Sequence, residues 1–412
     1  MENLTGQQVG ARLRAETPAI TLGESKGWCY FDGPSGTQMI DRAMRTMRVH
    51  VRTGMSNRHG FSPPGDDTEA FIARARMEIK ALYDADDYEV VFGQNMTSLA
   101  FTFSHALARA YGRDNRPVVV TELEHRANVD PWLQAFATYG TEPSWLKVDE
   151  HTLQLRRDDI DRLGDGPGPA LIAVTAASNA IGMRPDLAEL SAIARAQGSL
   201  LVVDAVHCTP HGPPSLRELR PDILLSSAYK FYGPHVGVAL VRSDLCEELE
   251  AFKVEPAPSH GPEKFETGSQ NHEAIAGLVG ALDGLAALVG EKGGEGARTA
   301  INALSEYEEE LANELVSNLE KLPSVRVFRG SDANSLYTPT IAMSVDRIAP
   351  GDLATALRER GVFVTAGDFY ATPLASRLGV GEKGGWMRLG VAGYTTPFEC
   401  EYFLNSLREI VE

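Results

Sequence analysis

Two short stretches decide the fold: residues 200–207, LLVVDAVH, and residues 223–234, ILLSSAYKFYGP. Each begins with an apolar run of strand length and continues into side chains that carry charge or form hydrogen bonds. Nearly continuous apolar strands are typical of parallel sheets that helices cover on both faces. Working outward, the same pattern predicts strands at 118–121, 171–175 and 236–241 and helices at 129–139 and 187–197. The sequence therefore predicts an α/β fold with a mostly parallel sheet.

Polar side chains follow four of these strands, at the point where each strand ends. They are Glu124 and His125 after the first strand, Asn179 after the second, Asp204 and His207 after the third, and Ser227, Tyr229 and Lys230 around the end of the fourth. In open parallel sheets the carboxyl ends of the strands meet at one edge, where ligands bind. We therefore expect these side chains to form one site.

The chain changes character near residue 290. The run GEKGGEG at 290–296 predicts a break, and an amphipathic helix is expected over 299–322. Strands at 325–328 and 340–345, a helix near 353–360 and a final helix from residue 397 follow. This order predicts an N-terminal segment (1–30), a large domain (31–290) and a smaller α+β C-terminal domain (291–412).

Composition restricts the class of protein. With 39 Lys and Arg against 56 Asp and Glu, the formal net charge is −17, which disfavours nucleic acid as a partner. The four cysteines lie far apart and form no C-x-x-C pair, so neither a disulfide framework nor a metal site is expected. The longest apolar candidate, 274–289, contains three glycines and Asp283, so no membrane span is expected. The N-terminus does not resemble a signal peptide, so we expect a cytoplasmic enzyme that acts on a small molecule.

Lys230 and Asp204 are the strongest candidates for chemistry. A lysine after a buried strand and between aromatic residues is partly desolvated, which lowers its pKa and favours the neutral amine that forms Schiff bases. The alternative is a surface lysine that begins a loop. Asp204 ends an apolar run, where a carboxylate needs a partner such as a pyridinium nitrogen. A structural capping role is equally common for such an aspartate.

Other polar residues have both a functional and an ordinary interpretation. His125 either stacks on a flat ring or acts as a base, or it is a satisfied loop residue. Asn179 either binds a phenolic oxygen or makes a turn. Residues 95–98, Asn-Met-Thr-Ser, open a predicted helix and form either a phosphate site or an N-cap. Arg388 either holds a substrate carboxylate or is exposed to solvent.

Taken together, the order and placement of these residues resemble one family. The stretches are FDGPSGTQ (31–38), EHRANVDPW (124–132), VDAVH (203–207), SAYKFYGP (227–234) and FETGSQN (265–271). They resemble the class V aminotransferases of fold type I, specifically the branch similar to cysteine desulfurases and isopenicillin N epimerase. The resemblance covers nearly the whole chain. It implies the fold type I architecture of pyridoxal 5′-phosphate (PLP) enzymes, with a large and a small domain.

The resemblance also implies roles for individual residues. Lys230 resembles the lysine that binds PLP and moves the Cα proton, and Asp204 resembles the aspartate that keeps the pyridine nitrogen protonated. Arg388, with Asn179 beside it, matches the substrate-binding residues. Ser269 resembles a hydroxyl contributed across the interface of a homodimer. The other implied cofactor contacts are His125 on the ring, Asn179 and His207 near the phenolic oxygen, and Asn95, Met96, Thr97, Ser227 and Tyr229 around the phosphate.

One departure from the family bears on function. Where desulfurases carry their nucleophilic cysteine, this chain reads TAGDFYATP at 365–373, with Tyr370 at the matching position. Persulfide chemistry requires that thiolate, so an ordinary cysteine desulfurase is disfavoured. The resemblance then implies a C–S lyase that acts by β-elimination on an amino acid or amino-acid conjugate. The alternatives are an aminotransferase or a decarboxylating oxidative deaminase, with Tyr370 as a candidate catalytic gate or acid.

Two remote alternatives remain. Residues 227–230 formally match the S-x-x-K signature of serine acylases, with 331–334 as a partial S-D-N match, but no K-T-G follows. A non-catalytic module on a PLP-type scaffold is the other alternative, although such a module would be expected to lose Lys230 or Asp204.

Overall fold

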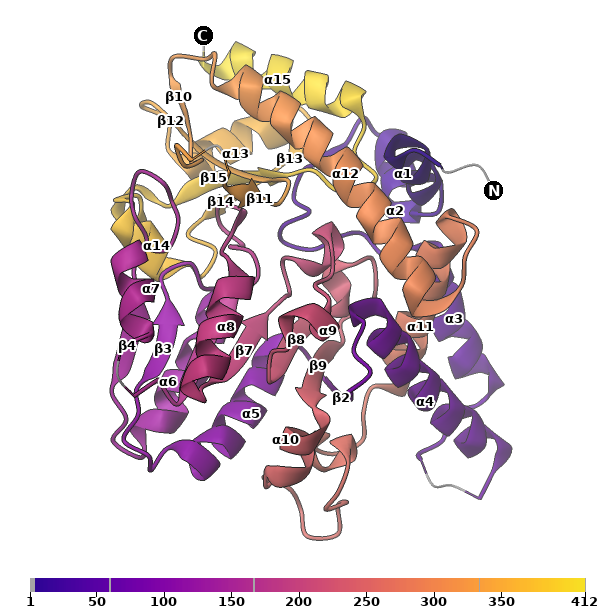
Figure 1. Cartoon of the computed structure of the whole chain (residues 1–412). Helices are drawn as coiled ribbons and strands as arrows, with labels where there is room; N and C mark the ends of the chain where they lie inside the picture. The colour runs from indigo at the N-terminus through magenta and orange to yellow at the C-terminus, as the bar shows by residue number, and fades with distance from the viewer. Residues whose placement is uncertain (1–3, 59–60, 166, 333, 412) are drawn as a thin grey trace.

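The computed structural model of the chain describes residues 4–58, 61–165, 167–332 and 334–411. Its largest element is an α/β layer built on a central sheet (Figure 1). In the described residues this sheet has seven strands, which in spatial order are β2 (Tyr88–Gly93), β9 (Gly237–Arg242), β8 (Ile223–Ser227), β7 (Leu200–Asp204), β5 (Leu171–Thr175), β3 (Val118–Thr121) and β4 (Pro143–Leu146).

The directions of the strands confirm a mostly parallel sheet. The strands β8, β7, β5, β3 and β4 run parallel, whereas β9 is antiparallel to both of its neighbours. The strand predicted at 236–241 is β9, an exception to the parallel arrangement. The reason is its short connection to β8, since a parallel crossover needs a dozen or more residues.

Both faces of the large sheet are buried, as the apolar runs predict. Alternate side chains of one strand point to opposite faces, and here they enter two different cores. In β7, Leu201 and Val203 join one core while Val202 joins the other. A strand with no solvent-facing side has no place for an alternating polar pattern, which explains the continuous runs.

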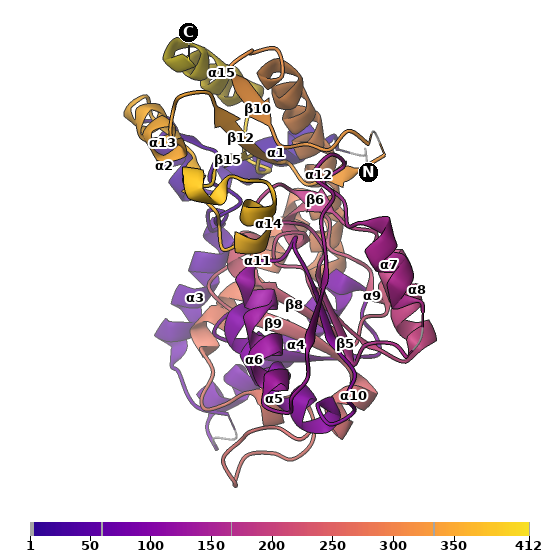
Figure 2. The ribbon, with the colours of Figure 1, turned by 90° about the vertical axis from the view of Figure 1, so that its left-hand side faces the viewer.

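Helices cover these two faces (Figures 1 and 2). They are α3 (Asp41–Thr53), α4 (Pro63–Tyr83), α5 (Met96–Tyr111), α6 (Asp130–Ala137), α7 (Arg157–Leu163), α8 (Leu187–Gln197), α9 (Leu216–Leu219), α10 (Ser243–Glu248) and α11 (His272–Leu288). No single helix in the described ranges is long and apolar enough to cross a membrane, although α11 and the next helix, bent by 58°, pass that test as a pair.

A second, smaller assembly follows α11. Its sheet contains β10 (Val325–Val327), β12 (Thr340–Val345), β15 (Trp386–Gly390) and β14 (Thr365–Gly367) in spatial order. Its helices are α12 (Gly293–Leu319), α13 (Pro350–Glu359), α14 (Thr372–Arg377) and α15 (Pro397–Val411). Figure 2 shows these orange and yellow elements stacked above the large sheet. The antiparallel pairing of this sheet fits the predicted α+β character.

The helix α12 begins earlier than the glycine pattern suggests. The chain does break between α11, which ends at Leu288, and α12, but the break is shorter than the run at 290–296, because α12 starts at Gly293 and includes Gly294 and Gly296. A Cβ on Gly294 would lie 1.9 Å from the backbone oxygen of Glu78 in α4. These glycines therefore allow two helices to approach closely and do not end a helix.

The helix α12 also joins two cores. Its first half, with Ala297, Ile301 and Leu304, packs into one core of the large sheet. Its second half, with Leu311 and Leu315, packs into the core of the small sheet. The predicted domain boundary near residue 290 stays a prediction.

The N-terminal segment packs on this assembly. It forms α1 (Gly6–Ala15), α2 (Pro18–Glu24) and β1 (Cys29–Tyr30), and β1 pairs with β13 (Val362–Phe363). A further two-stranded sheet joins β6 (Met183–Arg184) to β11 (Leu336–Tyr337).

Candidate active site

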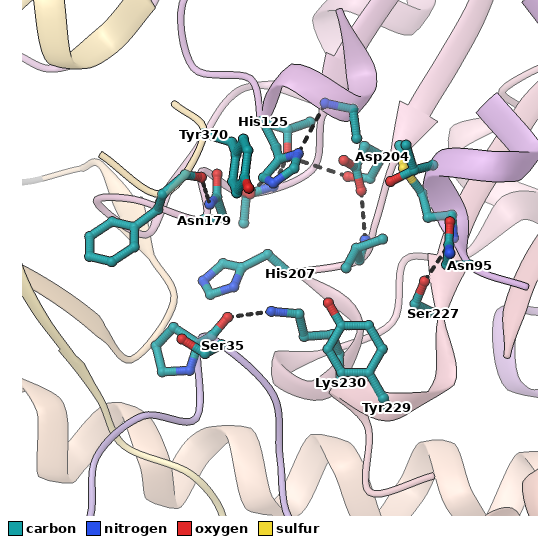
Figure 3. Close-up of a pocket in the computed structure, with 18 of the residues that line it drawn as sticks. Ser35, Asn95, His125, Asn179, Asp204, His207, Ser227, Tyr229, Lys230 and Tyr370 are labelled. Carbon is teal, nitrogen blue, oxygen red and sulfur yellow. Dashed lines mark hydrogen bonds between the residues drawn. The ribbon is translucent and has the colours of Figure 1, made fainter. Parts of the chain in front are cut away.

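A cavity of about 300 Å³ lies at the carboxyl edge of the large sheet, where residues of the small assembly also line it (Figure 3). Residues from both assemblies line it: Pro34, Ser35, Asn95, Met96, Thr97, His125, Ala127, Thr175, Ala177, Asn179, Asp204, Val206, His207, Ser227, Tyr229, Lys230, Phe369, Tyr370 and Arg388. The structure thus brings together the predicted site residues with two exceptions. Glu124 is fully buried and its carboxylate accepts hydrogen bonds from Thr121, Asn128 and Thr175. Ser269 is exposed and lies outside the cavity.

Lys230 lies in a 3-10 turn, Ala228–Lys230, directly after β8. The side chain is buried, with 8% of its surface exposed, and its amine donates to the carbonyl oxygen of Pro34. Burial, aided by the charge of Arg388, lowers the pKa of Lys230 to about 7, while Asp204 opposes that shift. About half of these amines are therefore neutral at pH 7, so Lys230 is suited to nucleophilic attack and to proton transfer.

Asp204 is the last residue of β7 and is buried. Its Oδ1 accepts a hydrogen bond of 2.9 Å from the backbone N–H of Val206. Burial raises the pKa of Asp204 to about 6, although this hydrogen bond and Lys230 lower it. The carboxylate therefore stays mostly ionised at neutral pH and can hold a cation inside the cavity.

His125 presents a neutral ring to the cavity. Its Nδ1 accepts a hydrogen bond of 3.0 Å from the backbone N–H of Ala127, which places the proton of the neutral ring on Nε2. Burial lowers the pKa of His125 to about 4, with Lys230 and Arg388 acting in the same direction. The ring lies 5.2 Å from that of Tyr370, whose side chain is 68% exposed at the cavity mouth. An uncharged flat ring is suited to stacking and poorly suited to holding a proton.

One end of the cavity is the N-terminus of α5. The N–H of Met96 donates to Ser227 Oγ at 3.0 Å, and the N–H of Ser98 donates to Asn95 Oδ1 at 2.9 Å. Asn95 is thus an N-cap, and its side chain is already engaged. Thr97 lies between these amides and lines the cavity. The start of a 16-residue helix favours an anion at this end.

Arg388 lies at the opposite end on β15, with 3% of its surface exposed. Its Nη1 donates to the carbonyl oxygen of Asn179 at 2.5 Å, and its Nη2 donates to Ser35 Oγ at 2.9 Å. Burial lowers the pKa of Arg388 to about 9, opposed by Asp32 and Tyr229. A buried cation with donors to spare is suited to binding a carboxylate.

Two predicted contacts have partners that the sequence did not indicate. His207 lines the cavity, but its Nε2 lies 3.2 Å from Thr338 Oγ1 and 2.9 Å from Thr340 Oγ1. The ring of Tyr229 stacks on that of His235, with centroids 4.9 Å apart and planes inclined by 8°. Contacts with these neighbours therefore fix the orientation of the His207 and Tyr229 rings where they line the cavity.

The residues of the cavity fit PLP. Asp204 would hold the pyridine nitrogen, His125 would cover one ring face, and the start of α5 with Ser227 would hold the phosphate. Asn179 Oδ1 and Arg388 Nε are buried polar atoms with no hydrogen-bond partner among the described residues. Buried polar atoms without partners are costly, so they indicate a polar ligand at this place.

Sequence reasoning missed several lining residues. Ser35 lies inside the quoted 31–38 stretch but was not assigned, and only its bond to Arg388 reveals it. Phe369 precedes Tyr370 in a loop with no periodic pattern. Ala127 and Ala177 are small residues that leave space, and no sequence pattern marks such a role.

The geometry does not support a serine acylase. Ser227 ends a strand and accepts a hydrogen bond from Met96, whereas an S-x-x-K serine opens a helix. Ala333, part of the partial S-D-N match, lies outside the described residues.

Comparisons with known proteins identify the family. The family model for class V aminotransferases matches residues 29–403. Over 404 residues the chain is 26% identical to an uncharacterized protein of Mycobacterium tuberculosis, MT3887, covering 97% of this chain and 98% of the relative. It is 27% identical over 423 residues to the cysteine desulfurase CsdA of Escherichia coli, covering 98% of each.

Solved structures share the fold. The crystal structure of CsdA from Escherichia coli superposes with a TM-score of 0.81 at 25% identity, covering 98% of this chain and 99% of that one. An apo cysteine desulfurase from Thermococcus onnurineus NA1 gives a TM-score of 0.84 at 22% identity, covering 97% of each chain.

The chain therefore belongs to the class V aminotransferase family. It is a PLP-dependent enzyme with the fold type I architecture. Its relatives include cysteine desulfurases, so it stands in the branch of the family that the sequence motifs indicate.

Proposed function

We propose that this enzyme is a lyase that cleaves the C–S bond of a cysteine S-conjugate and releases a thiol. The observation that carries this proposal is the absence of a thiol at the cavity. All four cysteines (Cys29, Cys208, Cys246 and Cys400) are described, buried and outside the lining of the cavity. Burial raises the pKa of Cys29 and of Cys246 to about 11, so these two are also poor thiolates.

The desulfurase relatives support cleavage of a C–S bond. Without a protein thiol at the cavity, the sulfur is released in a product and is not transferred to the protein. A desulfurase reaction needs a protein thiolate to accept the sulfur atom. In the proposed reaction the sulfur keeps its substituent and leaves with the electron pair of the C–S bond. The balance is R–S–CH2–CH(NH3+)–COO− plus water, giving R–SH, pyruvate and ammonium.

The residues of the cavity divide this work. Arg388 binds the substrate carboxylate, which places Cα beside Lys230. The Lys230 amine, with a pKa lowered to about 7, removes the Cα proton and can pass it to the departing sulfur, which leaves as R–SH. Asp204 holds a proton on the cofactor ring nitrogen. When bound, PLP supplies an electron sink conjugated to Cα.

The test is identification of the products. Holoenzyme is incubated with S-alkyl and S-aryl cysteines and with free cysteine, and the products are identified by mass spectrometry. Equal amounts of pyruvate and thiol from a conjugate are expected. A cofactor that retains the amino group of the substrate would indicate transamination. Carbon dioxide together with an aldehyde would indicate decarboxylative deamination. Sustained persulfide formation from free cysteine would refute the missing-thiol argument.

We further propose that Lys230 is the lysine that binds PLP, in a cytoplasmic homodimer. The lowered pKa of Lys230 and its depth in the cavity support the first part. Four free cysteines fit a reducing compartment. Ser269 is exposed, so a second subunit can contact it. Borohydride reduction of the holoenzyme followed by peptide mapping should place the cofactor on Lys230, and a label on another lysine would refute this assignment.

A further inference from the structure

The side chain of Phe369 lies flat against the guanidinium of Arg388. The guanidinium carbon is 3.7 Å from the ring centroid, the shortest cation–aromatic contact in the described part of the chain. One face of the guanidinium is therefore closed to a ligand. In its plane, Nη1 and Nη2 each donate one N–H, to Asn179 and Ser35, and each keeps a second N–H, whereas Nε has no hydrogen-bond partner among the described residues.

The backbone that carries this ring is strained. Phe369 and Tyr370 have φ angles of 55° and 58°, the left-handed region that is unfavourable for a non-glycine residue. Such a conformation persists only where the surroundings hold it. Here the side-chain amide of Asn179 donates to the Phe369 carbonyl oxygen at 2.9 Å, and the N–H of Arg126 donates to the Tyr370 carbonyl oxygen at 2.9 Å.

Asn179 connects the two halves of this arrangement. Its backbone oxygen accepts from Arg388, and its side chain holds the backbone of Phe369. The aromatic ring and the cation are thus positioned by the same residue, at the end of the cavity that faces the small sheet.

We propose that Phe369 is a positioning residue for the substrate carboxylate: it fixes the plane of the Arg388 guanidinium and closes one of its faces, so that the carboxylate binds in that plane, at the edge where Nε has no partner. A carboxylate bound side-on in that plane has a defined orientation, which in turn fixes the direction of the Cα–H bond relative to Lys230. This inference rests on the proposed function only in taking an amino acid as the substrate. The alternative is that the Phe369 ring blocks Arg388 until the ring moves away. In that case, removing the ring would strengthen carboxylate binding, whereas the proposal expects it to weaken binding.

The test uses a ligand that cannot react. The probe is 3-(methylthio)propanoate, which has the carboxylate and the thioether but no amine, and its amide serves as the uncharged counterpart. Binding of both to the holoenzyme is measured by NMR titration. The variant Phe369→Leu keeps much of the volume but loses the aromatic face, and Phe369→Tyr keeps the face. Phe363→Leu is the matched control, because Phe363 is a half-buried phenylalanine that contacts Trp28 and Tyr30 and lies outside the cavity.

Phe369→Leu is expected to weaken binding of the carboxylate about fivefold, within the range for a desolvated cation on an aromatic face. Binding of the amide should change less than twofold, Phe369→Tyr should restore carboxylate binding, and Phe363→Leu should leave it unchanged. Equal or tighter carboxylate binding by Phe369→Leu would overturn the proposal, as would an equal loss for carboxylate and amide. Neither measurement involves turnover, so this result is separate from whether the enzyme proves to be a lyase.

Discussion

Replacing Gly294 with alanine is expected to destabilise the fold by about 2 kcal/mol, although alanine is the better helix former. A Cβ at this position would lie 1.9 Å from the backbone oxygen of Glu78 and 2.8 Å from the backbone nitrogen of Leu82. Both are backbone atoms of α4 and cannot rotate away. The start of α12 would have to move by more than 1 Å relative to α4, since ordinary contacts begin near 3.4 Å.

The magnitude follows from two opposing effects. Overpacking costs up to about 3 kcal/mol, and exchange of glycine for alanine in a helix gains about 1 kcal/mol. At about 2.1 cal/mol/K per residue, a chain of 412 residues that unfolds as one unit has an unfolding entropy near 0.9 kcal/mol/K. A net loss of about 2 kcal/mol then lowers the unfolding midpoint by about 2 °C.

A matched control is available in α13. Gly351 lies in the first turn of that helix, is exposed, and its added Cβ would have nothing within 4 Å. Gly351→Ala is therefore expected to raise stability by about 1 kcal/mol. Both variants are compared with the parent by thermal and urea unfolding of the holoenzyme. A Gly294→Ala protein as stable as the parent would show that this glycine is not required for the close approach.

Three further predictions concern the site. The pKa of Lys230 is lowered from its ordinary value of 10.5 to about 7, so the neutral fraction of its amine rises about tenfold between pH 6 and pH 8. The rate at which apoenzyme takes up PLP, measured by stopped flow, should rise with pH in the same way. A rate that does not change with pH would contradict this prediction. Asp204→Asn removes the carboxylate from the ring nitrogen and should weaken PLP binding about tenfold to hundredfold in equilibrium dialysis, whereas unchanged affinity would assign Asp204 a structural role only. If Ser269 completes the site of a second subunit, inactive Lys230→Ala and Ser269→Arg proteins should regain activity when refolded together, and a mixture that stays inactive would count against the shared site.

The sequence was sufficient to predict that the side chains at the strand ends lie together. Asp204 and Lys230 each follow an apolar run, and the convergence of parallel strand ends at one edge is enough to bring them together. His125 and Asn179 were placed in the same way. These predictions needed only local patterns and one rule of sheet geometry.

Other features depend on contacts between distant parts of the chain. From the sequence alone, the glycines at the start of α12 predict a break. A glycine that lets a neighbouring helix approach closely looks the same in the sequence as a glycine that ends a helix. Phe369 lies in a loop without periodicity, and its role follows from a contact with Arg388 that no spacing reveals. The partner of Ser269 belongs to a second chain, so no single-chain pattern determines it.

The helix α12 has a mechanical consequence for catalysis. It is 27 residues long, a rod of about 40 Å, and its two halves are embedded in different cores. Lys230 directly follows a strand of the large sheet. Arg388 lies on β15 of the small sheet, between Met387 and Leu389, which belong to the core of that sheet. Because α12 takes part in both cores, it links the element that carries the base to the one that carries the carboxylate-binding group, in addition to the direct bonds of Arg388 to Asn179 and Ser35. No residue of α12 lines the cavity among those the structure describes.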